Sequence, residues 1–308
     1  MNNFSHKLYI LTEHDDTYRQ LVADLKLPDL VITEQRDEAS ILLAAPPMAA
    51  KQLDKFPQLV WLQSIYAGVD ALLQQADKRD YHLTNVKGIF GQQIAEYVLG
   101  YTIAHYRHFR RYQQQQAQQH WQPHSYVSLT QKRMVILGTG SIGVHLAHSA
   151  QAMGLETIGV NRSGIPPKGS PFVDTYHIQD LDKALATADV IVNTLPNTPD
   201  THHLLNAKTL QAAQHALLFN VGRGATLCQQ GLLQSLAAGN IEHAYLDVFE
   251  TEPLEHQHPY WQHTNVTVTP HIAALSFPDQ VVAIFGENYL RWRDGFALHH
   301  QVDFNKGY

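Results

Sequence analysis

The sequence predicts an α/β protein with two doubly wound domains, each a parallel sheet covered by helices on both faces. Three observations support this prediction. Short apolar runs alternate along the whole chain with polar stretches of helical spacing or turn residues. The runs VIVNTLP and ALLFNVG are too uniformly apolar to have one solvated face, as expected of interior parallel strands. The 308 residues, 44% hydrophobic and 16% charged, suffice for two cores rather than one.

The first part of the chain contains five runs with the length and composition of strands. They are Leu8–Leu11, Leu30–Ile32, Ile41–Ala45, Leu59–Ser64 and Leu83–Val86. A long helix is predicted from Gly91 onward, because Ile94, Val98 and Tyr101 share one face and no proline occurs until Pro123. The glutamine-rich tract 113–119 is interpreted as the polar end of this helix, which we expect to link the two domains.

The second part of the chain repeats the alternation. Its predicted strands are Met134–Leu137, Glu156–Val160, Asp189–Thr194, Ala216–Asn220, Ala244–Asp247 and Val266–Thr269. A last amphipathic helix over Asp279–Trp292 is expected to pack back against the first domain. We therefore expect residues 1–98 and 272–308 to form one discontinuous, flavodoxin-like domain into which residues 99–271 are inserted.

Composition excludes several classes of function. A net charge of −6 without a long basic run argues against a nucleic-acid partner. The start of the chain turns polar after a few apolar residues, so neither a signal peptide nor a membrane span is predicted. The single cysteine, Cys228, cannot form an internal disulfide and suits a reducing compartment. We therefore expect a cytoplasmic protein.

Histidine is abundant, with 20 residues, which raises the question of a metal site. The pairs His202-His203 and His299-His300 and the spaced pair His256-x-His258 lie among polar residues. No carboxylate or cysteine set completes a ligand cage at a familiar spacing. The sequence therefore predicts solvated surface histidines and no metal.

A phosphate-binding fingerprint follows the strand Met134–Leu137. Gly138, Gly140 and Gly143 form G-x-G-x-x-G, and a helix is predicted to begin near Ser141, with Ile142 also in the turn. Glycine serves for the tight turn at the first position, for close backbone approach to a pyrophosphate at the second, and for helix–strand packing at the third. The helix N-terminus offers N–H donors and a positive dipole end to the anion. The pattern predicts that residues 99–271 are a Rossmann-like dinucleotide-binding domain.

The turn after the next strand, Asn161-Arg162-Ser163, bears on which dinucleotide binds. It lies 18 positions after Gly143, where enzymes that use NAD commonly place an acid for the ribose hydroxyls. No acid is present. Arg162 can hold a 2′-phosphate by charge-assisted hydrogen bonds, and Asn161 and Ser163 can donate more, which favours NADP(H). The alternative is that Arg162 stacks over adenine or points to solvent, so that NAD(H) also binds.

Three chemically capable side chains follow predicted strands, where open α/β sheets bind ligands. They are Arg223 in NVGRG, Glu252 in DVFETEP and His271 in TPHIA. With two further motifs, QSIYAGVD at 63–70 and GIFGQQIAE at 88–96, the sequence resembles the D-isomer-specific 2-hydroxyacid dehydrogenase family over nearly its whole length. Seen alone, each of the three could be an ordinary surface or strand-end residue.

The resemblance implies a role for each of these side chains. Arg223 would anchor the carboxylate and polarise the carbonyl of a 2-oxo acid. His271 would act as general acid in reduction and general base in the reverse direction, and Glu252 would pair with its ring and favour the imidazolium. The backbone N–H groups of Ala67, Gly68 and Val69, beside Tyr66, would hold the substrate carboxylate. The remaining cofactor contacts implied are Thr194, Leu195, Pro196, Val221, Gly222, Arg223, Asp247 (on the nicotinamide amide), His271 and Ala273.

The most specific expectation is NADPH-linked reduction of a small 2-oxo acid, because the Asn161-Arg162-Ser163 turn resembles glyoxylate and hydroxypyruvate reductases of this family. The first alternative is an NAD-linked dehydrogenase of D-lactate or of branched D-2-hydroxy acids. The second, of another class, is a non-catalytic dinucleotide-sensing binding protein, as in transcriptional corepressors that resemble the family. The resemblance also implies a homodimer formed through Gly88 to Trp121.

Overall fold

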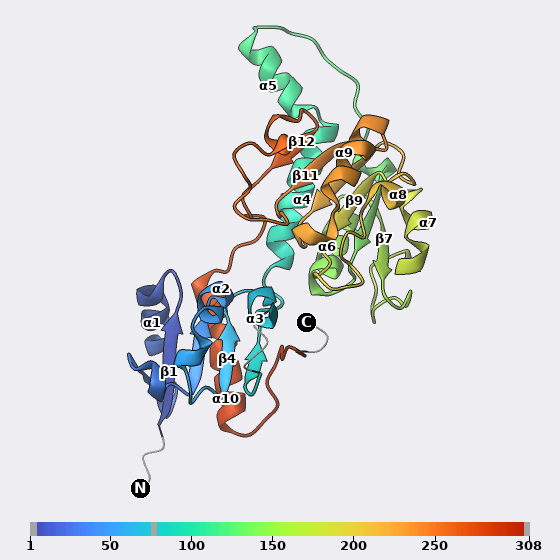
Figure 1. Cartoon of the computed structure of the whole chain (residues 1–308). Coiled ribbons are helices and arrows are strands. Elements are labelled where there is room, and N and C mark those ends of the chain that lie inside the picture. Colours follow the sequence, from blue (N-terminus) through green and yellow to red (C-terminus); the bar gives the residue numbers. More distant parts are fainter. Residues whose placement is uncertain (1–4, 75–78, 305–308) are drawn as a thin grey trace. The chain divides into compact units, whose positions relative to one another are not determined.

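The computed structural model describes residues 5–74 and 79–304, so both ends of the predicted first domain and residues 75–78 lie outside the described residues. Two compact units are formed, Met1–Ile89 with Ser276–Tyr308, and Phe90–Leu275 (Figure 1). These boundaries fall several residues from the predicted 98/99 and 271/272. The first boundary differs because helix α4 (Gly91–Tyr106) packs against helix α6 (Ser141–Ala152) from its first residue. A Cβ on Gly91 would lie 2.6 Å from Cβ of His145.

The first unit contains a five-stranded sheet in the order β2-β1-β3-β4-β5, with every neighbouring pair parallel. This is the flavodoxin-like order, as the sequence predicts. The central strand β3 is buried along its whole length, which explains its uniformly apolar sequence ILLA. The strands are β1 (His6–Leu11), β2 (Leu30–Ile32), β3 (Ile41–Ala44), β4 (Trp61–Ser64) and β5 (His82–Thr84), and the α-helices are α1 (Asp15–Asp24), α2 (Pro46–Ala50), α3 (Asp70–Gln74) and α10 (Pro278–Arg293).

Helix α10 returns from the far end of the sequence to complete this unit, which confirms the prediction for 279–292. It packs against α1. Its Phe285 stacks on Trp61 of β4, with ring centroids 5.3 Å apart and an angle of 11° between the ring planes. Both rings are fully buried, so this contact joins the C-terminal helix to the sheet core.

The second unit contains a seven-stranded parallel sheet in the order β12-β11-β10-β9-β6-β7-β8. Counted from β6, this is the doubly wound order 3-2-1-4-5-6 with one more strand at the edge. The order reverses between β6 and β9, and ligands bind such folds beyond the strand ends at this point. The strands are β6 (Arg133–Leu137), β7 (Glu156–Asn161), β8 (Asp174–His177), β9 (Val190–Asn193), β10 (Ala216–Asn220), β11 (Ile241–Leu246) and β12 (Val266–Val268), and the helices beside α4 and α6 are α5 (Phe109–Ala117), α7 (Leu181–Leu185), α8 (Ala207–Leu210) and α9 (Gln229–Ala238).

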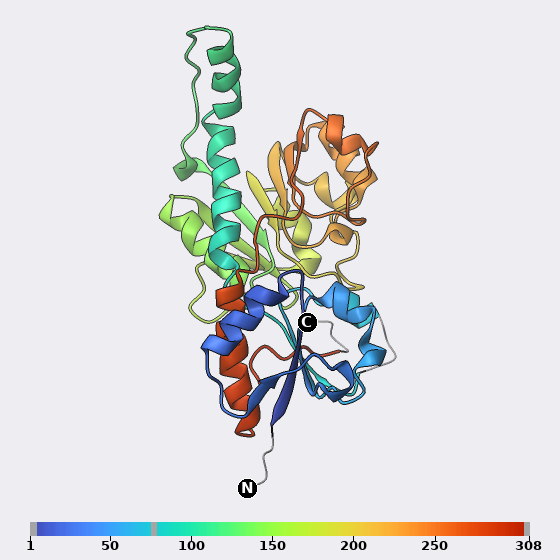
Figure 2. The ribbon, with the colours of Figure 1, turned by 90° about the vertical axis from the view of Figure 1, so that its left-hand side faces the viewer.

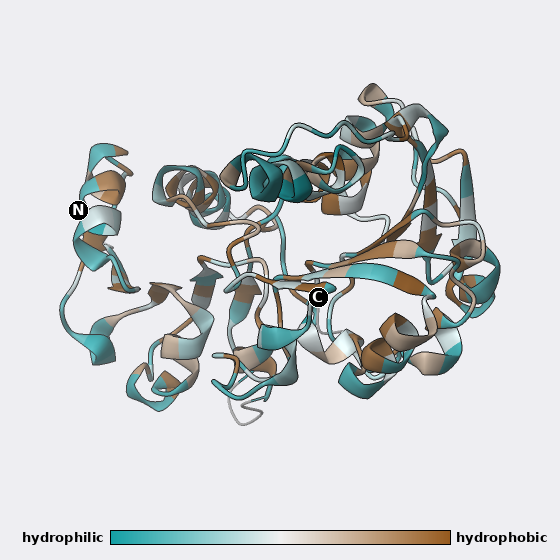
Figure 3. Cartoon of the chain, turned by 90° about the horizontal axis from the view of Figure 1, so that it is seen from above, coloured by the Kyte–Doolittle hydropathy of each residue, from teal (hydrophilic) through white to brown (hydrophobic). Residues whose placement is uncertain are grey.

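Burial in this sheet follows the sequence pattern. Every residue of β9 and β10 is buried, as predicted for strands covered on both faces. Figure 3 shows brown on strands and also on parts of the helices. Strand β8, with the sequence DTYH, was not predicted, because it is a polar strand at the sheet edge and has no fully buried residue.

The prediction of one long helix from Gly91 is wrong in one respect, because the structure has two helices there. α4 ends at Tyr106, and α5 begins at Phe109 after His108, whose φ of 57° is left-handed (Figure 2). Histidine is among the residues that adopt this conformation more readily than most, so a sequence without proline or glycine can still break here. The backbone then returns along α5, where Nε2 of His108 lies 2.9 Å from the carbonyl oxygen of Ser125. Within the described ranges, neither these helices nor any other is long and apolar enough to cross a membrane.

Candidate active site

The glycine-rich turn after β6 has the predicted form. Gly138 has a φ of 102°, and a Cβ there would lie 2.6 Å from Oγ1 of Thr194. A Cβ on Gly143 would lie 2.0 Å from the carbonyl oxygen of Gly138, so helix and turn touch through bare backbone. Gly140 differs, because its φ is −76° and a Cβ would have no atom within 4 Å. Packing within the protein therefore requires glycine at 138 and 143 but not at 140.

Gly140 is also the N-cap of α6, which begins at Ser141 as predicted. The N-cap has no side chain that could accept from the first N–H groups of the helix. These donors and the positive end of the helix dipole lie at the carboxyl end of β6, beside the point where strand order reverses. Thr194, directly after β9, donates from Oγ1 to the carbonyl oxygen of Leu137 (2.9 Å) and so joins the two strand ends. Open space above Gly140, next to helix N–H groups for which the described part of the chain supplies no acceptor, fits a pyrophosphate.

Asn161 shapes the turn that follows β7. Its Oδ1 accepts hydrogen bonds from the N–H groups of Ser163 (3.0 Å) and Gly164 (2.7 Å) and from the Ser163 hydroxyl (3.2 Å). Its Nδ2 donates to Oγ1 of Thr139 (2.9 Å) and to the carbonyl oxygen of Ile165 (2.8 Å). Both ends of the amide are thus engaged inside the protein, so Asn161 holds the turn in shape and ties it to the glycine-rich loop. Arg162 is exposed on this turn.

Asp247 organises the segment that carries His271. This buried carboxylate follows β11 and accepts hydrogen bonds from the Thr269 hydroxyl (2.7 Å), the N–H of Ile272 (2.8 Å) and the N–H of Ala273 (2.9 Å). The N–H of His271 donates to the Asp247 carbonyl oxygen at 2.9 Å. His271 itself has a φ of 54°, which costs free energy unless neighbouring contacts impose it. A carboxylate offers about four acceptor positions, so Asp247 retains capacity for one more donor.

His271 and Glu252 form a hydrogen-bonded pair. Nδ1 of His271 lies 2.8 Å from Oε2 of Glu252, while the other carboxylate oxygen accepts from the N–H of Phe249 at 2.9 Å. The hydrogen bond to Glu252 raises the pKa of His271 above its ordinary value, against an opposing effect of burial. Burial raises the pKa of Glu252, but its hydrogen bonds from His271 and Phe249 outweigh this and hold that pKa below the usual range. The ring is therefore oriented with Nδ1 on the carboxylate, leaving Nε2 to exchange a proton.

Arg223 completes this group. It follows β10 and is half-buried. Its positive charge lowers the pKa of both Glu252 and His271, so the three side chains lie close enough to interact electrostatically. One of its guanidinium nitrogens donates to the carbonyl oxygen of Gly222 at 2.8 Å.

The Arg223 turn rests on buried polar residues. Asn193, at the end of β9, donates to Oδ1 of Asn220 (2.8 Å) and to Oγ1 of Thr226 (2.6 Å). Asn220 in turn donates to the carbonyl oxygen of Arg223 (3.2 Å), and Thr226 donates to the same oxygen (2.6 Å). The roles of Asn193 and Thr226 were missed at the level of sequence. The only signal for Asn193 is that an uncharged polar residue stands where an apolar strand ends, and Thr226, in the turn Gly224–Thr226, has no such signal.

The candidate substrate loop lies in the first unit. It follows β4, and the carbonyl oxygens of Tyr66 and Ala67 accept from Oγ of Ser64 (2.8 Å) and Nδ2 of Asn85 (2.7 Å). Among the described residues, the N–H groups of Ala67, Gly68 and Val69 have no protein acceptor. A short run of unsatisfied N–H donors can receive an anion. Tyr66, beside them, has a pKa raised by burial and by Glu13.

Comparison with known proteins gives a consistent result. Residues 99–273 match the family described as D-isomer specific 2-hydroxyacid dehydrogenase, NAD binding domain. The sequence is 36% identical over 253 residues to glyoxylate/hydroxypyruvate reductase A of Serratia proteamaculans, covering 79% of each protein.

Solved structures resemble the whole chain. A D-isomer specific 2-hydroxyacid dehydrogenase family protein from Aeromonas salmonicida has a TM-score of 0.92 at 42% identity, with 97% of this chain and 99% of that chain covered. An NADPH-dependent glyoxylate/hydroxypyruvate reductase from Sinorhizobium meliloti, solved with NADP and sulfate, has a TM-score of 0.87 at 27% identity and covers 99% of this chain and 100% of its own.

Proposed function

This chain belongs to the D-isomer specific 2-hydroxyacid dehydrogenase family and is an NAD(P)-dependent oxidoreductase, and on that premise we propose that it reduces a small 2-oxo acid with NADPH. The substrate we propose is of the glyoxylate or hydroxypyruvate type, and the product is the D-2-hydroxy acid. The observation that carries the proposal is the 2.8 Å hydrogen bond between His271 and Glu252 beside Arg223. His271 of this pair is the proposed proton donor, and Arg223 is the proposed cation.

The proposed mechanism assigns one task to each of these side chains. A nicotinamide bound at the proposed cofactor site would supply the hydride. His271, whose protonated form is favoured by its pairing with Glu252, would donate the Nε2 proton to the carbonyl oxygen. Arg223 binds the substrate carboxylate and polarises the carbonyl with its permanent charge. In the reverse direction His271 accepts the proton.

Three features support NADPH as the preferred cofactor. No acid occupies the turn at 161–163, so nothing there repels a 2′-phosphate. Arg162 is exposed on that turn, and Asn161 holds the turn through five hydrogen bonds. The Sinorhizobium relative, described as NADPH-dependent, was solved with NADP. In this proposal the pyrophosphate is held by the glycine-rich turn and the start of α6, which are Gly138, Gly140, Ser141, Ile142 and Gly143. The rest of the cofactor is lined by Thr194, Leu195, Pro196, Val221, Gly222, Asp247 and Ala273.

The N–H groups of Ala67, Gly68 and Val69 are proposed to receive the substrate carboxylate beside Tyr66.

Steady-state kinetics of the purified protein test the whole proposal. We expect the highest kcat/KM for glyoxylate or hydroxypyruvate with NADPH, and a much lower value for pyruvate or with NADH. Faster turnover with NADH across this panel would contradict the NADPH assignment. Tight NADPH binding without turnover of any 2-oxo acid would instead indicate a dinucleotide-sensing protein.

A homodimer and a reducing, cytoplasmic environment are part of the same proposal. The segment Gly88 to Trp121, which we expect to form the dimer, exposes large apolar side chains at Phe109, Tyr112 and Trp121, the last of which is 96% exposed. Apolar groups of this size are unfavourable in water, which supports burial of this segment against a second copy. The lone Cys228, which has no disulfide partner, supports the reducing compartment.

A further inference from the structure

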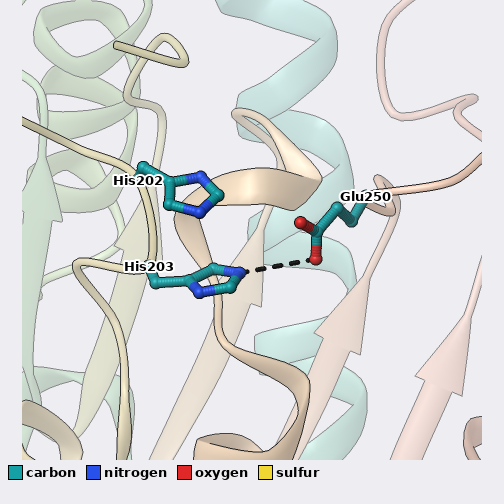
Figure 4. Close-up of side chains that lie close together, drawn as sticks. All are labelled: His202, His203 and Glu250. Carbon is teal, nitrogen blue, oxygen red and sulfur yellow. Dashed lines mark hydrogen bonds and ion pairs between the residues drawn. The ribbon is translucent and has the colours of Figure 1, made fainter. Parts of the chain in front are cut away.

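Two neighbouring histidines and a glutamate meet in the second unit, apart from the His271–Glu252 pair. The ligand atoms of His202, His203 and Glu250 all lie within 4.8 Å of one another (Figure 4). Nε2 of His203 lies 3.4 Å from Oε2 of Glu250. His202 and Glu250 are exposed and His203 is half-buried, so an ion from solution can reach the site.

The backbone brings the two imidazoles to the same side. His203 has a left-handed φ of 49°, and the two rings stack with centroids 4.0 Å apart and an angle of 21° between their planes. Hydrogen bonds hold this conformation: the N–H of His202 donates to the carbonyl oxygen of Thr198 (3.0 Å), and that of His203 donates to the carbonyl oxygen of Ala225 (2.8 Å). Nδ2 of Asn206 donates to the carbonyl oxygen of His203 (2.8 Å). The backbone of His202 and His203 is thus already ordered before a ligand binds.

Glu250 is fixed against the same turn that holds His203. A Cβ on Gly224 would lie 1.9 Å from the carbonyl carbon of Phe249 and 2.3 Å from the nitrogen of Glu250, so this backbone packs directly on residue 224. The turn Gly224–Thr226 also supplies the Ala225 carbonyl that accepts from His203. Loops that follow β9 and β11 therefore meet on one support, which places the three side chains beside one another.

We propose that His202, His203 and Glu250 bind Zn²⁺. Two imidazole nitrogens and one carboxylate oxygen are a common three-ligand set for this ion, with water in the fourth position. Bonds of about 2.0–2.2 Å at a tetrahedral angle place two ligand atoms roughly 3.4 Å apart, close to the His203–Glu250 distance. The ligand atoms of His202 lie within 4.8 Å of those of the other two residues, so its exposed ring has to turn out of the stack with His203 to coordinate the same ion. No local pattern in the sequence indicates this site, because Glu250 lies far from the histidines in residue number.

The bound ion would join two loops that matter for the proposed active site. Glu250 is two residues before Glu252, and the supporting turn directly follows Arg223. Zn²⁺ would therefore brace the segments that carry both side chains without touching the reacting atoms. Because the ligands are assembled only in the folded protein, binding must raise its stability as the free Zn²⁺ concentration exceeds the dissociation constant.

The experiment measures Zn²⁺ binding by the full-length protein after removal of metal with EDTA. Isothermal titration with Zn²⁺ alone is expected to show one equivalent bound with a micromolar or lower Kd, and Tm should rise with Zn²⁺. His203→Asn, which keeps a residue tolerant of left-handed φ, and Glu250→Gln should each weaken binding at least tenfold while leaving the Tm in EDTA unchanged. Cys228→Ser should bind as the wild type does.

His299→Asn is the matched control. His299 and His300 are also adjacent and His299 also pairs with a glutamate, Glu287 at 3.2 Å, but the two rings lie 6.0 Å apart. Its Zn²⁺ affinity should equal that of the wild type. Wild-type affinity in His203→Asn and Glu250→Gln, or no binding by the wild type at 100-fold molar excess of Zn²⁺, would overturn the proposal. Anomalous scattering at the zinc edge from wild-type crystals locates the ion if a variant fails to fold, and a peak elsewhere would equally overturn it.

Discussion

Replacing Gly140 and Gly143 by alanine, one at a time, separates cofactor binding from folding within a single loop. The methyl group of Gly143→Ala would stand 2.0 Å from the Gly138 carbonyl oxygen, whereas a carbon–oxygen contact needs slightly over 3 Å, so helix α6 must withdraw by about 1 Å. Overpacking of this kind costs about 1–3 kcal/mol of unfolding free energy. The methyl group of Gly140→Ala would meet no protein atom within 4 Å at an ordinary φ of −76°. Its effect on stability should stay within about 1 kcal/mol.

For cofactor affinity, Gly140→Ala is the substitution expected to have the larger effect. The methyl group at residue 140 would occupy the space through which the pyrophosphate approaches the backbone. We expect Gly140→Ala to weaken NADPH binding at least tenfold, or about 1.4 kcal/mol. Urea denaturation gives the stability of both variants, and titration of NADPH fluorescence gives the affinity. If Gly140→Ala bound NADPH as tightly as the wild type, the G-x-G-x-x-G segment would be an ordinary turn and the assigned cofactor site would be wrong.

Three further predictions address the proton donor, the cofactor phosphate and the core. Glu252→Gln removes the partner that raises the pKa of His271, so the pKa of His271 should fall. Because reduction requires protonated His271, the basic limb of the pH profile of kcat/KM should then move to lower pH. A basic limb at the wild-type pH would contradict the pairing. Arg162→Ala should weaken NADPH binding by about 1.5–3 kcal/mol, the value of hydrogen bonds to charged groups, while NADH binding changes little; equal losses for both cofactors would exclude a phosphate contact. Phe219→Ala deletes a fully buried ring stacked on Tyr245 at 4.6 Å and should cost about 3–5 kcal/mol in urea denaturation, and a cost below about 1 kcal/mol would show that this part of the core is not closely packed.

The fold could be predicted well where strands are buried on both faces. Uniformly apolar runs such as those of β3, β9 and β10 are stable only where both faces of the strand are covered, and these strands are buried at every residue. β8 escaped prediction because an edge strand with the sequence DTYH has no apolar face. The break between α4 and α5 escaped because it rests on the backbone angle of a single histidine, His108, which the sequence does not reveal.

The candidate site divides in the same way. Gly138, Gly143 and the start of α6 follow from a local motif, so their geometry could be predicted from spacing alone. Asn193 could not be found, because its value lies in hydrogen bonds to residues on the next strand and in the turn after it. The expectation that Asn161 donates to a cofactor phosphate overlooked the two protein acceptors that already receive its N–H groups. Long-range polar pairing of this kind depends on strand order, which no local pattern contains.

His271 is assigned the proton transfer that makes this dinucleotide site catalytic, and the most direct test of that role is His271→Asn. Asparagine tolerates the left-handed φ of 54° at this position better than alanine does, so loss of activity would not reflect backbone strain. The measurement compares kcat for reduction of glyoxylate or hydroxypyruvate with the dissociation constant for NADPH in the same preparation. We expect kcat to fall by about 10²–10⁴-fold, the usual contribution of a general acid, with NADPH affinity nearly unchanged. Wild-type turnover by this variant would contradict the role assigned to His271.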